Sequence, residues 1–287
     1  MSRRHLRTPI GFGATEPAPG LRPSSASATQ GGRWRPDGLG ALVRIGVLTP
    51  DFDPVPESEL WAMAPTGVSV HVSRVPWNRQ SRGSAPALAL EQARTFAAPP
   101  HVDSAVELLA AVSPQVILYA FTSSSYVLEA KEEEALRARL EQRGGGVPVL
   151  LTCTAGVSAL RVLGARRIAV VHPPWFPTQL NASGEQYYQV RGFEAVFCAP
   201  MSPARPFTEV PASEVFDWAQ ANAPRRAEAV FIAGNGLRAV GVIQALEKSL
   251  RRPVLTANQV LLWQALQRVG AAERVPQYGR IFRAGKQ

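Results

Sequence analysis

The sequence predicts an α/β protein with two similar Rossmann-like lobes, each built on a parallel sheet, and a ligand cleft between them. Two observations carry this prediction: the chain repeats itself, and short β-rich runs alternate with helical patterns along each copy. Alternation of this kind favours parallel strands joined by right-handed crossovers. Such sheets bind ligands in the crevice outside the carboxyl ends of their strands, so the functional residues should follow the strands directly.

The repeat can be read from matched segments in the two halves. Residues 44–50 (RIGVLTP) match 167–173 (RIAVVHP), 116–123 match 229–236, 148–150 match 253–255, and 159–164 match 265–270. The offset between partners falls from 123 to about 106 residues, so each unit is a small domain and not a solenoid repeat.

The elements follow from hydrophobic periodicity and composition. Strands are predicted at residues 43–48, 68–75, 116–120, 147–152, 168–171, 195–198, 229–233 and 254–256. Helices are predicted between them, at residues 105–112, 131–143, 157–163, 213–221, 238–250 and 260–269.

Residues 1–40 differ in kind, because they are rich in Gly, Pro, Ser, Ala and Arg and hold hardly an aliphatic cluster. Such a segment buries too little apolar surface to offset its ordering entropy, which predicts a disordered basic tail. Its six Arg against Glu16 and Asp37 give +4 of the formal +9, leaving +5 for the rest. That remainder is a weak bias toward anionic ligands and does not indicate nucleic-acid binding.

Composition also excludes several classes. No apolar run approaches the roughly 20 residues that span a bilayer, so no membrane partner is expected. Two cysteines, without a secretory apolar segment or Cys/His ligand spacing, indicate a reducing cytoplasm, no disulfide framework and no metal.

Small and polar residues follow the predicted strands, as a ligand site requires. Thr122 and Ser123 precede a predicted helix, and so do Gly234, Asn235 and Gly236. Hydroxyls and exposed backbone N–H groups would there join a helix N-terminus around an anion. Two such sites facing each other suit a small carboxylate or dicarboxylate.

From residue 44 to 270 the chain resembles the aspartate/glutamate racemase superfamily, within it the maleate isomerase and arylmalonate decarboxylase branch. The family has Pro-Ser-Ser-Asn after its first strand where this chain has residues 50–53 (Pro-Asp-Phe-Asp), and Thr-Pro-Tyr at the lobe junction where it has 172–175 (His-Pro-Pro-Trp). The late Ser-Asn-Gln matches residues 257–259 (Ala-Asn-Gln). The family's Ala-Cys-Thr-Ser and Ser-Cys-Thr-Asn match residues 120–123 and 233–236, so Phe121 and Gly234 stand at its two catalytic cysteine positions.

This resemblance implies a small (di)carboxylic acid as ligand, chemistry without a cofactor and a homo-oligomer. It also implies that the chain returns to lobe 1, which would comprise residues 41–155 and 259–287, with lobe 2 at 156–258. The substrate would contact Thr122, Ser123, Gly234, Asn235, Gly236, Arg238, Trp175 and Asn258. Neither Phe121 nor Gly234 can ionise, which argues against racemisation by two thiols.

Three residues are candidates for the missing proton-transfer group, each with a structural alternative. His172 ends a strand with an ordinary pKa near neutrality, or it is a structural hydrogen-bonding histidine. Asp53 replaces the family's substrate-binding Asn, or it caps a helix that Pro54 begins. Cys153 follows the fourth strand as a substitute thiol, or it is a small buried hydrophobe. Arg238 either neutralises a carboxylate or is an exposed helical arginine.

Two functions therefore remain in view. The first is cofactor-free isomerisation or decarboxylation through an enediolate-like intermediate held by Thr122, Ser123 and the backbone of residues 234–236. The alternative is a catalytically inactive homologue that keeps the cleft as a carboxylate sensor or an interaction surface.

Overall fold

A computed structural model describes residues 42–77, 90–204, 209–271, 275 and 277–284, all of which belong to the unit Asp37–Gln287. The tail predicted at residues 1–40 lies outside the described residues. Within the described part of the chain, no helix is long and apolar enough to cross a membrane. That part also holds no group of three His, Cys, Asp or Glu side chains suited to a metal ion.

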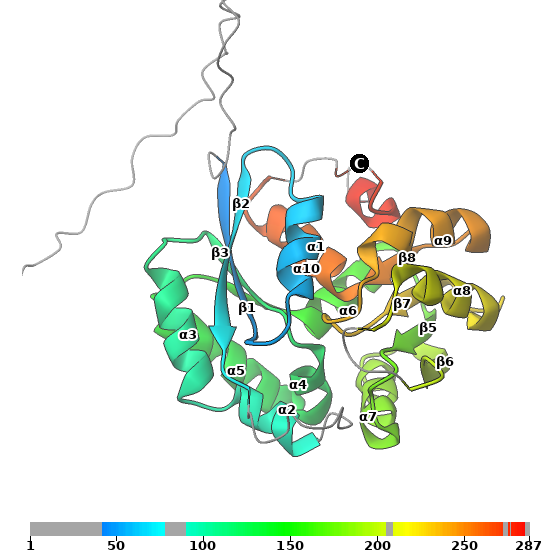
Figure 1. The fold of residues 1–287 in the computed structure, drawn as a ribbon, viewed down its shortest axis with the longest axis horizontal. Helices are drawn as coiled ribbons and strands as arrows, with labels where there is room; N and C mark the ends of the chain where they lie inside the picture. The colour runs from blue at the N-terminus through cyan, green and yellow to red at the C-terminus, as the bar shows by residue number, and fades with distance from the viewer. Residues whose placement is uncertain (1–41, 78–89, 205–208, 272–274, 276, 285–287) are drawn as a thin grey trace, which may run out of the picture. The chain divides into compact units, whose positions relative to one another are not determined.

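Two four-stranded parallel sheets form the framework (Figure 1). The first has the order β2-β1-β3-β4 and the second the order β6-β5-β7-β8, so the strands are arranged identically in both. Their bounds are β1 Val43–Pro50, β2 Val68–Val75, β3 Val116–Tyr119, β4 Val149–Leu151, β5 Arg167–His172, β6 Glu194–Pro200, β7 Ala229–Ile232 and β8 Val254–Thr256. The predicted two-lobed α/β fold is confirmed, and each strand lies within two residues of its prediction.

Strand register shows which residues of the two lobes are equivalent. Leu48 lies opposite Tyr119 in the first sheet, and Val171 lies opposite Ile232 in the second. Counting on from these pairs makes Thr49 equivalent to His172, Phe121 to Gly234, and Thr122 to Asn235. The duplicated sequence therefore brings equivalent residues to the carboxyl edges of both sheets.

Helices cover the sheets and separate them. Their bounds are α1 Val55–Met63, α2 Leu90–Ala97, α3 His101–Ala110, α4 Thr122–Val127, α5 Ala130–Arg143, α6 Thr152–Val162, α7 Thr178–Gln189, α8 Ala212–Asn222, α9 Ile243–Leu250 and α10 Ala257–Arg268, with short 3₁₀ turns η2 Val240–Val242 and η3 Arg280–Arg283. A helix does follow β3, but it begins at Thr122, so Thr122 and Ser123 form its first turn and do not precede it as predicted. α1, α2 and α7 lie outside the predicted set.

The helix predicted at residues 238–250 was wrong over its first five residues. Arg238 lies in a loop, η2 follows, and α9 begins only at Ile243. The reason is tertiary: the backbone N–H groups of Ala239 and Val240 donate to a carboxylate from α1, which holds the chain in a turn before the helix.

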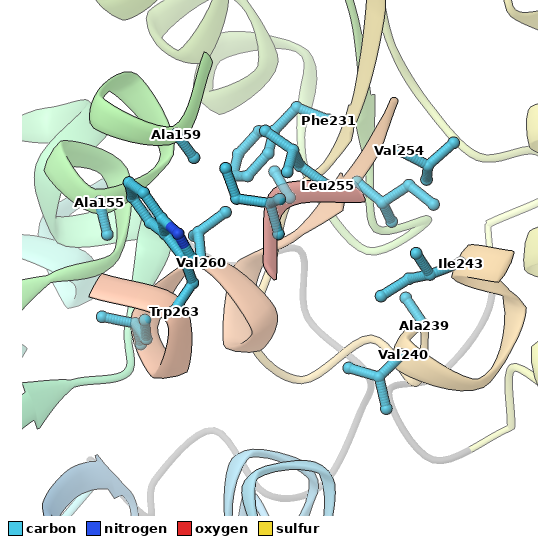
Figure 2. Packing of buried hydrophobic residues seen from close by; sticks show 14 of the residues in the cluster. Ala155, Ala159, Phe231, Ala239, Val240, Ile243, Val254, Leu255, Val260 and Trp263 are labelled. Atoms are coloured by element: carbon cyan, nitrogen blue, oxygen red, sulfur yellow. The ribbon is translucent and has the colours of Figure 1, made fainter. Parts of the chain in front are cut away.

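The two sheets share one apolar core, which packs around α6 and α10. Figure 2 shows Trp263 of α10 beside Ala155 of α6, with the Phe231 ring of β7 close by. A Cβ atom at Gly156 would lie 3.1 Å from that ring, so the small residues of α6 permit this close approach. α10 also packs on α1, so a helix late in the chain completes the surroundings of the first sheet.

Candidate functional site

The two lobes meet through Thr122 and Asn235, the equivalent residues just beyond β3 and β7. The backbone N–H of Thr122 donates to the Asn235 Oδ1 atom at 2.9 Å, and its hydroxyl donates to the same oxygen at 2.8 Å. The Gly234 N–H donates in turn to the Thr122 hydroxyl oxygen at 3.3 Å. The Thr152 hydroxyl lies 3.2 Å from that amide oxygen and 3.0 Å from the Tyr119 carbonyl, and its one hydrogen serves one of them at a time. Hydroxyl and amide donors thus converge on one buried oxygen atom.

A relay of side chains fixes the orientation of Asn235. The Asn235 Nδ2 group donates to Asn258 Oδ1 at 2.9 Å, and Asn258 Nδ2 donates to Glu59 Oε2 at 2.8 Å. Because a carboxylate accepts at one end and a backbone N–H donates at the other, both amides can point only one way. Glu59, Asn258, Asn235 and Thr122 are each at most 6 % exposed. We call these four residues the polar relay.

In the second lobe, the sequence predicted that backbone N–H groups at a helix start would bind a ligand anion. The carboxylate of Glu59, from α1, takes that place. Its Oε1 atom accepts the N–H groups of Ala239 at 2.6 Å and Val240 at 3.0 Å, at the start of η2. Burial raises the pKa of Glu59 to about 7, although these donors, Asn258 and the charge of Arg238 oppose that rise. Arg238 itself is exposed. The prediction that residues 234–236 directly precede a helix was therefore wrong, and an internal carboxylate caps the later turn.

Asp53 lies between β1 and α1, at the carboxyl edge of the first sheet, the edge that Thr122 also follows. Its side chain is 3 % exposed, and its Oδ1 atom accepts the Val55 N–H at 2.9 Å. Burial raises the pKa of Asp53 to about 7, and the nearby charge of Glu59 raises it further while Val55 and Arg74 lower it. Asp53 thus accepts the N–H of Val55, the first residue of α1, from one residue before the N-cap Pro54, so Asp53 is not itself the N-cap that the structural alternative expects. It is also a carboxyl group with a near-neutral pKa, as acid–base catalysis requires.

His172 links the lobes from the end of β5. Its Nδ1 atom donates to Asn181 Oδ1 at 2.6 Å, because Asn181 Nδ2 is directed to the Cys198 carbonyl. Its Nε2 atom then accepts the hydroxyl of Tyr126, a residue of α4, at 3.1 Å. The ring is fully buried and stacks on Phe176, and burial lowers the pKa of His172 to about 4. This geometry favours the structural role for the neutral ring.

Cys153 lies in the interior, and Cys198 is partly buried. Cys153 is fully buried as the second residue of α6, equivalent to Asn258 in α10, and its Sγ atom lies 3.6 Å from the Thr122 carbonyl. Burial raises the pKa of the Cys153 thiol, which opposes thiolate formation. The Cys198 thiol lies 3.8 Å from the His172 Nδ1 atom, and burial raises its pKa to about 12.

An aromatic cluster fills the first lobe around Phe121. Its ring lies 4.3 Å from Phe96 and 5.4 Å from Trp77, centroid to centroid, and Phe52 meets Trp77 edge-on at 5.7 Å. A cavity of about 580 Å³ opens beside the cluster, lined by Trp77, Phe96 and His101 among others. Trp175 is half-buried against the shared core. The aromatic cluster thus begins at Phe121, the residue before Thr122.

The second-lobe equivalent, Gly234, is held where a side chain does not fit. Its φ is +88°, in the left-handed region that favours glycine, and a Cβ atom there would lie 2.3 Å from the Pro173 Cγ atom. Gly192 has the same φ of +88°, and nothing lies within 4 Å of its Cβ position. Comparing substitutions at Gly234 and Gly192 therefore separates the free energy lost to backbone strain from the free energy lost to the clash with Pro173.

Gly234→Ala is expected to lower the free energy of unfolding by about 2 to 3 kcal/mol, and Gly192→Ala by about 1 kcal/mol, because both strain φ but only the first meets Pro173. Urea denaturation of both variants measures the difference. Gly241→Ala, with an open Cβ position and no left-handed φ, is the neutral control. If both alanine variants lose the same free energy of unfolding, Pro173 moves aside without a measurable loss of stability.

Of the residues predicted for the site, the structure joins Thr122, Gly234, Asn235 and Asn258 through hydrogen bonds, with Ser123 and Gly236 buried beside them. Arg238 is exposed, and Trp175 is half-buried against the shared core. Glu59 was missed. Its sequence signal is an acidic residue beside Leu60, on the face of α1 that buries Leu60 and Met63.

Fold and site together define a class: a duplicated, two-lobed α/β protein with converging donors at facing carboxyl edges. The sequence model of the arylmalonate decarboxylase family matches residues 85–282, more than half of the chain. The chain therefore belongs to the arylmalonate decarboxylase family. No curated protein matches it by sequence at a significant level.

Solved structures share the fold. The maleate isomerase Iso of Pseudomonas putida S16, in a variant crystallised with maleate, is 20 % identical, with a TM-score of 0.74 over 85 % of this chain and 98 % of that one. A Nocardia farcinica maleate cis-trans isomerase variant, carrying a covalently bound succinylcysteine intermediate, is 23 % identical, with a TM-score of 0.74 over 84 % and 98 %. An arylmalonate decarboxylase is 19 % identical, with a TM-score of 0.66 over 84 % and 100 %.

Proposed function

We propose that the protein binds a small carboxylic acid at the facing edges of its two sheets and transfers a proton at the carbon next to the carboxylate. Phe121 and Gly234 take the positions of the family's catalytic cysteines, so no thiol takes part. Asp53 is the proton carrier. The observation that carries the proposal is this buried carboxyl group, with a pKa of about 7, at the same sheet edge as the Thr122 donors.

The chemistry follows from the acid itself. When a proton or CO₂ leaves the carbon beside a carboxylate, the electron pair spreads onto the carboxylate oxygens as an enediolate. Hydroxyl and backbone N–H donors such as those of Thr122, Ser123 and Gly234 stabilise that charge. Protonated Asp53 then returns a proton to the carbon. Because its pKa is near 7, Asp53 has both forms present at neutral pH.

Aromatic surface beside the site favours acids with an aryl or other apolar substituent. Trp77 and Phe96 line the cavity in the first lobe and Phe121 packs against both rings, and such rings contact planar apolar groups well.

Proton NMR of the protein in D₂O with maleate, phenylacetate and phenylmalonate tests the proposal. Deuterium incorporation or turnover is expected with at least one acid, and Asp53→Asn should slow it by about 10² to 10⁴-fold, the usual contribution of a general acid–base group. Asp217→Asn, at an exposed position on α8, is the matched control.

The second candidate is a non-catalytic carboxylate-binding homologue. It is favoured by the low pKa of the buried His172, by the buried Cys153 thiol and by the internal use of the Thr122 donors. An acid that shifts protein resonances but shows neither exchange nor turnover would support this candidate and contradict the first.

A further inference from the structure

Three pairs of consecutive arginines lie at the amino edge of the second sheet, the edge opposite the candidate site. Each pair lies at the start of a strand or within four residues before it, and these strands, β5, β7 and β8, are neighbours in the sheet. Neighbouring parallel strands are about 4.8 Å apart, so the fold brings the pairs together. The pairs are Arg166 and Arg167, Arg225 and Arg226, and Arg251 and Arg252. With Glu194 and Glu228 at the same edge, they carry +4 of the +5 outside residues 1–40.

The first lobe shows how many arginines such an edge needs for folding. By strand register, Arg44 is the equivalent of Arg167. Arg44 donates through Nε to the Ser113 carbonyl at 3.2 Å. Arg167 donates in the same way to the carbonyl of Arg226, the equivalent of Ser113, at 3.0 Å. The first lobe has uncharged residues at the five other positions, which are Val43, Val112, Ser113, Gly146 and Val147. The fold that both lobes share therefore needs one of the six arginines.

The two members of each pair differ in their contacts. The second member bonds to backbone carbonyls: Arg226 donates to Val196, and Arg252 donates through Nη1 to Pro224 and Ala227. The first member is exposed, and its guanidinium group has no hydrogen bond or ion pair to another described residue. These first members are Arg166, Arg225 and Arg251. Three guanidinium groups at one edge are thus available to a ligand.

Arg251 is held in a backbone conformation that favours glycine. Its φ is +56°, in the left-handed region, at the end of α9. The equivalent residue of the first lobe is Gly146, with a φ of +87°. A glycine at 251 would relieve the strain, so arginine lowers the stability of the fold at this position. Strain of this kind is concentrated at functional sites.

An open hollow of about 970 Å³ lies at this edge, between the ends of α8 and α9. Its lining includes Arg225, Arg251 and Arg252. Ser249 also lines it, and the Ser249 Oγ atom accepts the Gln220 Nε2 group at 2.6 Å, which leaves the hydroxyl hydrogen for a ligand. The carboxylate of Glu228, at the rim, is already bonded to Arg167 at 2.7 Å and to two backbone N–H groups. The hollow therefore presents mainly positive charge and donors.

We infer that this hollow binds a small ligand that carries two or more adjacent phosphate groups. Guanidinium groups bind phosphate through paired N–H donors, so several of them around one hollow suit several phosphates. A hollow of this volume suits a small molecule. A single-stranded nucleic acid suits it less, because bases stack on aromatic side chains and the residues described as lining the hollow are not aromatic. This site is separate from the proposed carboxylic-acid site, which lies at the carboxyl edges of the sheets.

Isothermal titration of the full chain with inorganic tripolyphosphate and with orthophosphate, at low salt, tests the inference. Tripolyphosphate is expected to bind at least about tenfold more tightly, because it meets several guanidinium groups at once. Arg225→Ala and Arg251→Gly should each weaken its binding by about tenfold. Arg94→Ala, which removes the same charge from the first lobe, should change it by less than about threefold. Arg251→Gly should unfold at no lower urea concentration than the wild type, since it relieves the strained φ.

The stability of Arg251→Gly keeps the test clear of unfolding, and Arg225→Gln replaces Arg225→Ala if circular dichroism shows that the latter does not fold. Absent tripolyphosphate binding, equal binding of the two phosphates, or binding that no variant at 225 or 251 weakens overturns the inference. A single-stranded oligonucleotide and vesicles of phosphatidylcholine and phosphatidylserine are titrated in parallel. If either binds the wild type and tripolyphosphate does not displace it, the edge serves a larger polyanion and the inference is wrong.

Discussion

Arg191→Ala is expected to lower the free energy of unfolding by about 3 to 5 kcal/mol, because it leaves a buried carboxylate without its charged partner. Arg191, just after α7, donates through Nη2 to Glu133 Oε2 of α5 at 2.9 Å, and the Glu133 side chain is 5 % exposed. The guanidinium also lies 3.5 Å from the centre of the Tyr187 ring, and the Tyr187 hydroxyl donates to the same carboxylate at 3.1 Å. This ion pair joins the two lobes.

Urea denaturation of the wild type and the variant at pH 7.5 measures this loss. Arg94→Ala is the matched control, because the Arg94–Glu132 pair has both side chains about half exposed (49 % and 47 %) and should cost less than about 1 kcal/mol. Glu133→Gln in the Arg191→Ala background should recover part of the stability, since it removes the unpaired charge. A loss at Arg191 no larger than that at Arg94 would contradict the argument.

The second large effect is a loss of stability with rising pH that comes from Asp53. Burial raises its pKa in the folded state from its usual 3.8 to about 7, so between these values the folded chain holds a proton that the unfolded chain has released. The contribution is therefore fully present below about pH 4 and is lost as the pH rises through 7, and about 3 pKa units correspond to roughly 4 kcal/mol.

Other groups titrate in the same window, so the comparison must be with a variant. Glu59, with a raised pKa, acts in the same direction as Asp53, whereas His172, whose pKa is lowered to about 4, contributes stability that is lost as the pH falls. Denaturation of the wild type and Asp53→Asn between pH 4 and 8 isolates Asp53, because asparagine keeps the oxygen that accepts the Val55 N–H. The free energy of unfolding of Asp53→Asn should rise relative to that of the wild type as the pH rises. If the difference between the two free energies is the same at every pH, the pKa of Asp53 is ordinary.

The lobes and most strands could be predicted from sequence because their signals are local. Alternation and duplication placed every strand to within two residues, and a helix does follow β3, although it begins at Thr122 and not after Ser123. α7 was not predicted, since Gly184 and several polar residues weaken its helical pattern. A side chain at Gly184 would lie 2.6 Å from Tyr126 and 2.8 Å from His172, so tertiary packing selects glycine there against helix propensity.

The connections within the site could not be predicted. Glu59 and Asn258 are 199 residues apart, and Thr122 and Asn235 are 113 apart. Each residue type suits a polar site, but only the fold shows that Asn235 turns its amide to the donors and that Glu59 takes the anion position. The same limit applies to His172, whose place after a strand suggested catalysis, while its burial between Tyr126 and Asn181 favours a structural role.

The position of α10 has a consequence for how the protein folds during synthesis. This helix follows the whole second sheet in the chain, yet it packs on α1, and its Asn258 side chain bonds to Glu59. When the ribosome has completed the first sheet, α10 has not yet been made. The face of α1 on which it packs is then uncovered, and Glu59 lacks its hydrogen bond to Asn258. We therefore expect the first lobe to remain incompletely folded until α10 emerges, so the two copies of the duplicated unit reach their native state together and not in the order of translation.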